Sequence, residues 1–199
     1  MANANTPYGL RPHGYLSGSP WNGQARMYCI PSSDGNAYAI GDPVKVAGSA
    51  DVKGIPTVVL MTPGSGMTGV IVAAAGTKYG ASGGDPTNLN TTIVPATKSK
   101  DYYVLVCDDP NVLYTVQEVG TGTPLAAADV ALNANLVAGT NNGYISQWMV
   151  NNATEATTST LDLQLMSLAP IPDNTFGAYA KWIVRINNHS YNAGITAAS

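Results

Sequence analysis

The chain has 199 residues, of which 45% are hydrophobic and 11% are charged, and its net charge is −3. This length is enough for one domain with its own core, and the hydrophobic content excludes a disordered chain. The nine Lys and Arg residues are scattered, which argues against nucleic acid as a partner. No stretch approaches the ~20 apolar residues that cross a bilayer, so we expect no membrane partner.

The charged fraction of 11% is far below the roughly 25% of ordinary soluble domains. Asn, Thr, Ser and Gly supply the polarity instead. Such a surface suits a protein that stays packed against partners, because burying charge is costly. Secreted adhesins and lectins share this composition. The N-terminus has neither the basic nor the apolar stretch of a signal peptide, so we expect the protein to be made and kept in a cytosol, or to leave it only by lysis.

Residues 1–24 are rich in Pro and Gly, which excludes a helix or a long strand. The segment nevertheless carries large side chains that a solvated tail would not need. We therefore predict an extended arm that docks on a surface, either a neighbouring protein or its own domain. Aromatic residues and Arg are the usual anchors of interfaces. The predicted partner-binding residues are Tyr8, Arg11, Tyr15 and Trp21.

Short β-branched or aromatic runs alternate with turn residues through the rest of the chain, which predicts many short strands. The predicted strands are 26–30, 44–47, 57–61, 70–75, 91–94, 101–107, 112–119, 160–168 and 178–187. Both faces of 101–107 are apolar, so we expect this strand to be covered on both sides. The turn residues 108–111 predict a hairpin that joins it to 112–119.

Alternation predicts which side chains of the last two strands face the core. In 160–168 the leucines are expected to point inward, with Asp162 and Gln164 outward. In 178–187 we expect Trp182, Val184 and Ile186 on one face and the two basic residues, Lys181 and Arg185, on the other.

One short helix is expected over 124–132, an Ala-rich run that begins with Pro124 and has Thr123 as a cap. Many short strands and one short helix predict an all-β fold, either a β-sandwich or jelly roll or a barrel. The expected organisation is an extended N-terminal arm (1–24), a β-rich domain (25–187) and a C-terminal tail (188–199).

Two glycine motifs resemble catalytic or cofactor signatures but lack the required context. Residues 64–69 match G-x-G-x-x-G, yet the next residues open with Val70-Ile71-Val72 and predict a strand where a dinucleotide site needs a helix. The glycines are then expected to form a hairpin loop. Residues 80–84 match G-x-S-x-G but lie in a polar loop without the strand and helix of a nucleophile elbow. We therefore expect no cofactor.

The remaining titratable residues do not form a catalytic or metal-binding pattern. Asp108 and Asp109 are the only paired carboxylates, and a turn between strands explains them, with a calcium site as the alternative. His13 and His189 lie in breaker-rich terminal segments and are expected to be partly exposed. Cys29 and Cys107 lie in strand-like runs, so we expect two buried free thiols, with a disulfide as the alternative. These observations predict neither an enzyme nor a metal protein.

Several stretches resemble cement (head decoration) proteins of tailed phages. They are residues 2–12 (ANANTPYGLRP), 40–44 (IGDPV), 104–110 (VLVCDDP) with 116–118 (VQE), 173–177 (DNTFG) and 181–189 (KWIVRINNH). The resemblance implies a β-rich body, often a jelly roll or barrel, that forms homodimers or homotrimers. It also implies binding to the major capsid protein on the capsid exterior, where such proteins bridge capsomers. The family supplies no catalytic residues.

Two other functions are compatible with the sequence. The first is another virion component, such as a tail-tube, head-fibre or head–tail joining protein. The second is a carbohydrate-binding β-sandwich, in which Trp21, Trp148 or Trp182 would stack on sugars.

Overall fold

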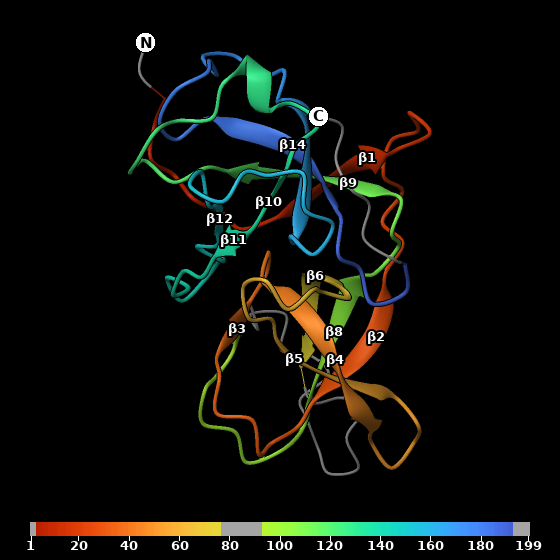
Figure 1. Ribbon diagram of the computed structural model, residues 1–199. Helices are drawn as coiled ribbons and strands as arrows, with labels where there is room; N and C mark the ends of the chain where they lie inside the picture. Colours follow the sequence, from red (N-terminus) through yellow and green to blue (C-terminus); the bar gives the residue numbers. More distant parts are fainter. Residues whose placement is uncertain (1–2, 77–92, 193–199) are drawn as a thin grey trace.

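The computed structural model describes residues 3–76 and 93–192. The fold is all-β, as the sequence predicts, with 41% of the described residues in strands and 2% in helix. Two lobes lie end to end: a five-stranded sheet forms one lobe and a closed barrel forms the other (Figure 1). The barrel is one of the two predicted architectures. The five-stranded sheet is a separate layer beside it.

The barrel has the strand order β2-β5-β4-β6-β8. Its strands are β2 (Arg26–Ile30), β4 (Pro43–Ala50), β5 (Pro56–Leu60), β6 (Gly69–Gly76) and β8 (Tyr102–Cys107). All the pairings are antiparallel except β2 with β5. A short pair, β3 (Tyr38–Ala39) with β7 (Ile93–Val94), lies beside the barrel.

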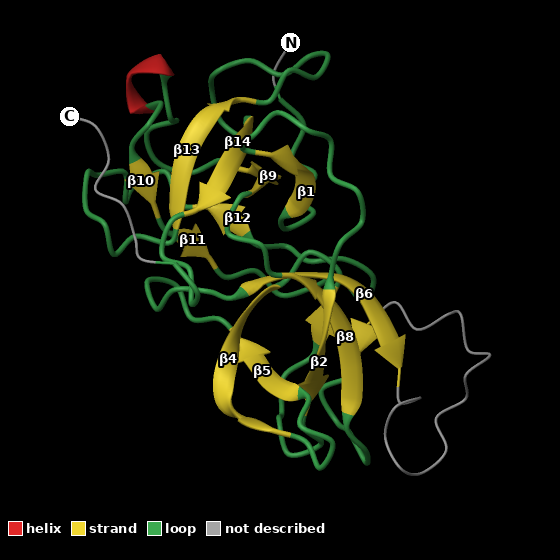
Figure 2. Cartoon of the chain, turned by 90° about the vertical axis from the view of Figure 1, so that its right-hand side faces the viewer, coloured by secondary structure: helices red, strands yellow, loops and turns green. Residues whose placement is uncertain are grey.

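The five-stranded sheet has the order β1-β9-β14-β13-β10 and is entirely antiparallel (Figure 2). Its strands are β1 (Arg11–Tyr15), β9 (Val112–Gln117), β14 (Lys181–Ile186), β13 (Leu163–Leu168) and β10 (Asn133–Ala134). A second short pair joins β11 (Leu136–Val137) to β12 (Met149–Val150).

The helix expected over 124–132 is reduced to the 3₁₀ turn η1 (Ala127–Asp129). The Asp129 carboxylate accepts a hydrogen bond from the Ala126 N–H, and Ala131 has a φ of 74°, which ends the turn. The next backbone groups pair with β13, since Ala131 donates to Leu165 and Leu165 donates to Leu132. Pairing at the sheet edge therefore replaces the helical hydrogen bonds that the Ala-rich composition favours.

The core crosses the junction between the lobes. One buried cluster combines sheet residues such as Trp182 and Tyr114 with Val70 and Cys107 of the barrel and with Met67 from the loop before β6. A second cluster fills the barrel interior around Tyr28, Tyr38, Val58 and Val104. Covering on both sides, as predicted for 101–107, is confirmed because β8 contributes to both clusters.

Two predicted hairpins are wrong. β8 and β9 follow each other in sequence, but β8 pairs with β2 and β6 while β9 pairs with β1 and β14. The turn at Asp108 and Asp109 therefore carries the chain from the barrel to the sheet. Likewise β5 and β6 flank the glycine loop without pairing, because β4 lies between them.

The segment expected as an extended arm is fastened to its own domain. β1 pairs with β9 from Arg11 to Tyr15, and Leu10 is 1% exposed within the core that joins the lobes. The Asn3 side chain donates to the backbone oxygens of Thr175 and Ala178. Packing on its own domain, the alternative considered for this segment, is therefore what the structure has.

Candidate functional site

The face of the five-stranded sheet that points away from the core is the candidate docking surface. Trp182, Val184 and Ile186 are buried, so Lys181, Ile183 and Arg185 lie on the opposite side, which confirms the predicted alternation. Cross-strand register extends this side across the sheet. We call it the outer face, and its members are Arg11, Leu113, Thr115, Gln117, Gln164, Lys181, Ile183 and Arg185.

A groove of about 620 Å³ opens on part of this face. Its apolar lining includes Leu113, Met166 and Ile183, and the loop from Tyr15 to Pro20 forms another wall. Leu16 on this loop is 46% exposed and adds an apolar side chain to the wall of the groove. The groove is therefore suited to an apolar side chain of a partner.

The N-terminal segment crosses the other part of the outer face. Gln117 is buried there, where its side chain accepts from the Thr6 N–H and donates to the Asn5 side chain. The Arg11 guanidinium lies 4.6 Å from the centroid of the Tyr8 ring, a cation–π contact. Burial raises the pKa of Tyr8 and outweighs the opposing effects of Thr115 and Arg11.

The four predicted partner-binding residues lie along one segment but differ in environment. Arg11 is exposed on the outer face, and Tyr8 is partly buried beside it. Tyr15 lines the groove, and its hydroxyl bonds to Asn22. Trp21 packs on the shared core, and its Nε1 is buried without a hydrogen-bond partner. The sequence did not single out Leu113, Met166 and Ile183, although alternation in their strands places them opposite the core.

A second, polar cleft of about 770 Å³ lies at the junction of the lobes, lined by Arg26, Asp108, Asp109 and Tyr191 among others. Asp108 is 6% exposed, accepts a 2.7 Å hydrogen bond from the Tyr28 hydroxyl and pairs with Arg26 at 3.4 Å. Tyr191 in turn lies 3.0 Å from the Tyr28 hydroxyl. Burial raises the pKa of Tyr28 strongly, with the two hydrogen bonds adding to the effect, so this phenol stays neutral.

His189 borders this network and corrects one prediction. It is 4% exposed, although the sequence suggested partial exposure, while His13 is exposed as expected. The His189 Nδ1 accepts from the Tyr191 N–H, and burial lowers its pKa, which favours the neutral ring. Within residues 3–76 and 93–192, no three His, Cys, Asp or Glu side chains gather as metal ligands would.

The G-x-G-x-x-G loop binds a carboxylate of the protein itself. Asp162, predicted to point outward, is 0% exposed and accepts hydrogen bonds from the Gly64 and Leu136 N–H groups. Burial raises the pKa of Asp162, and these backbone hydrogen bonds act in the opposite direction. The loop amides therefore fix the loop to the sheet lobe. The other motif, residues 80–84, lies outside the described residues.

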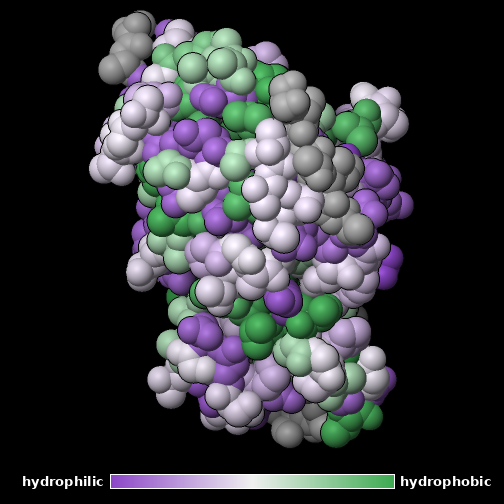
Figure 3. Space-filling model, viewed as in Figure 1, coloured by the Kyte–Doolittle hydropathy of each residue, from purple (hydrophilic) through white to green (hydrophobic). Residues whose placement is uncertain are grey.

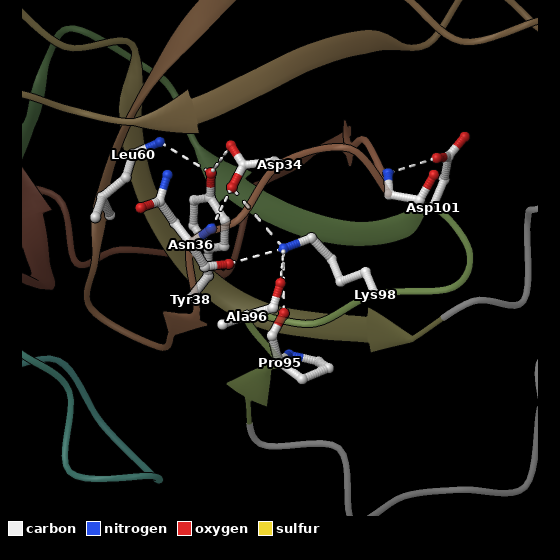
Figure 4. Close-up of polar contacts among 9 residues, drawn as sticks. Asp34, Asn36, Tyr38, Leu60, Pro95, Ala96, Lys98 and Asp101 are labelled. Carbon is white, nitrogen blue, oxygen red and sulfur yellow. Dashed lines mark hydrogen bonds and ion pairs between the residues drawn. The ribbon is translucent and has the colours of Figure 1, made fainter.

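A lysine network fastens two loops beside the barrel (Figure 4). The Lys98 side chain is 0% exposed, donates to the backbone oxygens of Asn36, Pro95 and Ala96, and lies 3.8 Å from Asp34. The Tyr38 hydroxyl donates to Asp34 and accepts from the Leu60 N–H. Because the Lys98 amino group donates to three backbone oxygens, its role is to hold these loops together and not to act as a nucleophile.

Two further carboxylates are buried away from the outer face. Glu118 accepts from the Trp182 Nε1 at 2.9 Å, its second oxygen has no described partner, and burial raises its pKa to about 7. Asp42 accepts from the Ala39 N–H, and burial raises its pKa to about 6. Cys29 and Cys107 are buried free thiols.

Comparison of the chain with family models, with curated proteins and with solved structures finds no match. Among the described residues, no helix is both long enough and apolar enough to span a bilayer.

Proposed function

We propose that this protein is a structural component of a tailed-phage virion, a cement protein that binds the outside of the capsid and bridges neighbouring capsomers. Its partners in this proposal are the major capsid protein and further copies of itself, as a homodimer or homotrimer. The outer face with its groove is the observation that carries the proposal, because apolar residues of three strands line an open recess of about 620 Å³ there.

Three other features support this function. The stretches that resemble phage cement proteins extend from residue 2 to residue 189. The charged fraction of 11% suits a surface that is covered in an assembly. Figure 3 shows one side of the molecule, on which hydrophobic and hydrophilic residues are interspersed over the described part of the chain. This distribution fits contacts made of many small patches.

A carbohydrate-binding function has weaker support, since Trp148 and Trp182 are 1% and 0% exposed and offer no ring for a sugar to stack on. Another virion part, such as a tail-tube, head-fibre or head–tail joining protein, differs from a cement protein in copy number. Quantitative mass spectrometry of virions separates the two, because cement proteins occur in hundreds of copies and joining proteins in far fewer.

The direct test is binding of the purified protein to expanded phage heads that lack it, measured by co-sedimentation and by cryo-electron microscopy. We expect saturable binding on the head exterior and heads that withstand higher temperature. Met166→Glu, which places a charge in the groove, should weaken binding about tenfold or more. Val52→Glu is the matched control, because Val52 is 96% exposed and does not line the groove. No binding to heads, or equal loss with both variants, would contradict the proposal.

A further inference from the structure

The strands of the five-stranded sheet differ in charge from the rest of the chain. β1, β9, β13, β14 and β10 contain Arg11, Lys181 and Arg185 together with His13, but neither Asp nor Glu. The whole chain, by contrast, has 12 acidic and nine basic residues. Three of the nine Lys and Arg residues of the chain therefore lie in one sheet whose strands contain no acidic residue.

Register places these three basic residues on the outer face. Arg11 is opposite Thr115, which is opposite Ile183. One row along, Leu113 is opposite Arg185, which is opposite Gln164. The two arginines therefore lie on adjacent cross-strand rows, and an apolar residue belongs to each row.

The basic side chains of the outer face have no carboxylate partner among the described residues. Ion pairs elsewhere in the described chain include Arg26 with Asp108 and Lys98 with Asp34. Arg11 instead lies over the Tyr8 ring. The Arg185 Nε is buried and has no hydrogen-bond partner in the described part of the chain. A guanidinium that is partly desolvated and lacks an acceptor is a favourable site for a carboxylate.

The groove adds an apolar recess to the positive charge of the outer face. Leu113 and Ile183, which share rows with the arginines, also line the groove of about 620 Å³. A ligand that crosses the outer face therefore meets positive charge and an apolar recess within one or two residues of its own length. Complementarity then requires acidic side chains next to an apolar one.

We propose that the outer face binds an acidic segment of a protein partner, with carboxylates on Arg11 and Arg185 and an apolar side chain in the groove. This inference rests on the proposed function, in which the partner is the capsid shell, and it names the chemistry of the capsid segment. The rest of the chain carries 12 acidic and six basic residues, so charge complementarity favours this face for an acidic segment.

The test uses the full-length protein and three fluorescent peptides of equal length, in which Leu alternates with Glu, with Gln or with Lys. Fluorescence anisotropy should show binding of the Glu–Leu peptide, weakened about tenfold when salt rises from 50 to 300 mM, because exposed charges are screened. Arg11→Gln and Arg185→Gln should each weaken binding about fivefold to tenfold. Arg26→Gln is the matched control, since Arg26 pairs with Asp108 away from this face.

Equal binding of the Gln–Leu or Lys–Leu peptide, or no binding of the Glu–Leu peptide, would overturn the inference. Arg11 is exposed, so its variant remains informative even if Arg185→Gln fails to fold. Head binding separates this inference from the proposed function. If heads bind the protein and neither salt nor Arg11→Gln changes this binding, the inference of an acidic partner segment is wrong and the cement function stands. Peptide binding without head binding would contradict the cement function alone.

Discussion

Gly9 and Gly41 meet where the N-terminal segment passes the junction of the two lobes, and the adjacent Leu10 N–H donates to the Gly41 oxygen at 3.0 Å. Gly9 has a φ of 68°, and a Cβ at this position would overlap the Gly41 oxygen and the Ser146 side chain. Only glycine fits this approach, so the segment is locked against the barrel at one backbone contact.

Gly9→Ala should therefore lower the free energy of unfolding by about 2 kcal/mol or more. Gly18→Ala is the matched control, because Gly18 also has a positive φ of 88° but has open space around it. Its expected cost is about 1 kcal/mol, from backbone strain alone. Urea denaturation of both variants measures the difference, and equal costs would show that the close approach contributes nothing.

Lys98→Met should destabilise the protein by roughly 2–3 kcal/mol, since it leaves three backbone oxygens and Asp34 without their cationic donor. Lys45→Met is the control, because Lys45 donates to one described oxygen, that of Ser65. Hydrogen exchange should also accelerate in residues 34–38. A variant as stable as the control would show that the Lys98 network is dispensable.

Ionisation of Glu118 should destabilise the protein as pH rises from about 5 to 8, against the opposing effect of His189, whose pKa burial lowers. Glu118 has its folded-state pKa raised from 4.5 to about 7, so the fold prefers the protonated carboxyl and binds a proton that the unfolded chain releases. Its contribution is fully present below about pH 4.5 and is lost by about pH 7, at a cost on the order of 3 kcal/mol. Asp42, with a pKa of about 6, acts in the same direction over a lower range.

Urea midpoints measured at pH 5, 6, 7 and 8 test this expectation. Glu118→Gln should flatten the decline, because an amide cannot ionise and its oxygen still accepts from Trp182. The exposed Glu155, changed to Gln, should leave the decline as it is. A Glu118→Gln variant whose stability depends on pH as that of the wild type does would contradict the assignment.

Neither cysteine should react with Ellman's reagent in the native protein. Both thiols are buried, and burial raises the pKa of Cys29 to about 11 and also raises that of Cys107, so thiolate is scarce at pH 8. Two thiols should appear after unfolding in guanidinium chloride without reductant. Fewer than two would reveal the disulfide that the residue count alone permits.

Local sequence pattern predicted nine of the fourteen described strands and missed β1 and four two-residue strands, and it could not predict which strands pair. Both β8 and β9 have the expected alternation, and the Asp108–Asp109 turn has hairpin composition. The edges of β8 are nevertheless taken by β2 and β6, which are distant in sequence. Strand pairing is decided by packing of the whole chain, so the four turn residues 108–111 could not predict it.

The sequence also predicted only part of the candidate site. The aromatic residues and Arg11 of the N-terminal segment were found because interface anchors have a recognisable composition. The groove was missed, since Leu113, Met166 and Ile183 come from three strands that only the register brings together. Asp162 was placed outward because alternation cannot anticipate that the Gly64 loop would supply N–H donors to a buried carboxylate.

The core that continues from sheet to barrel has a mechanical consequence. Residues of both lobes pack in one cluster, and the chain passes from the sheet to the barrel between β1 and β2 and returns to the sheet after Cys107. A hinge would have to open this cluster to water, so bending is as costly as partial unfolding. The two lobes therefore move as one body. When a partner holds the outer face, it also fixes the position and orientation of the barrel.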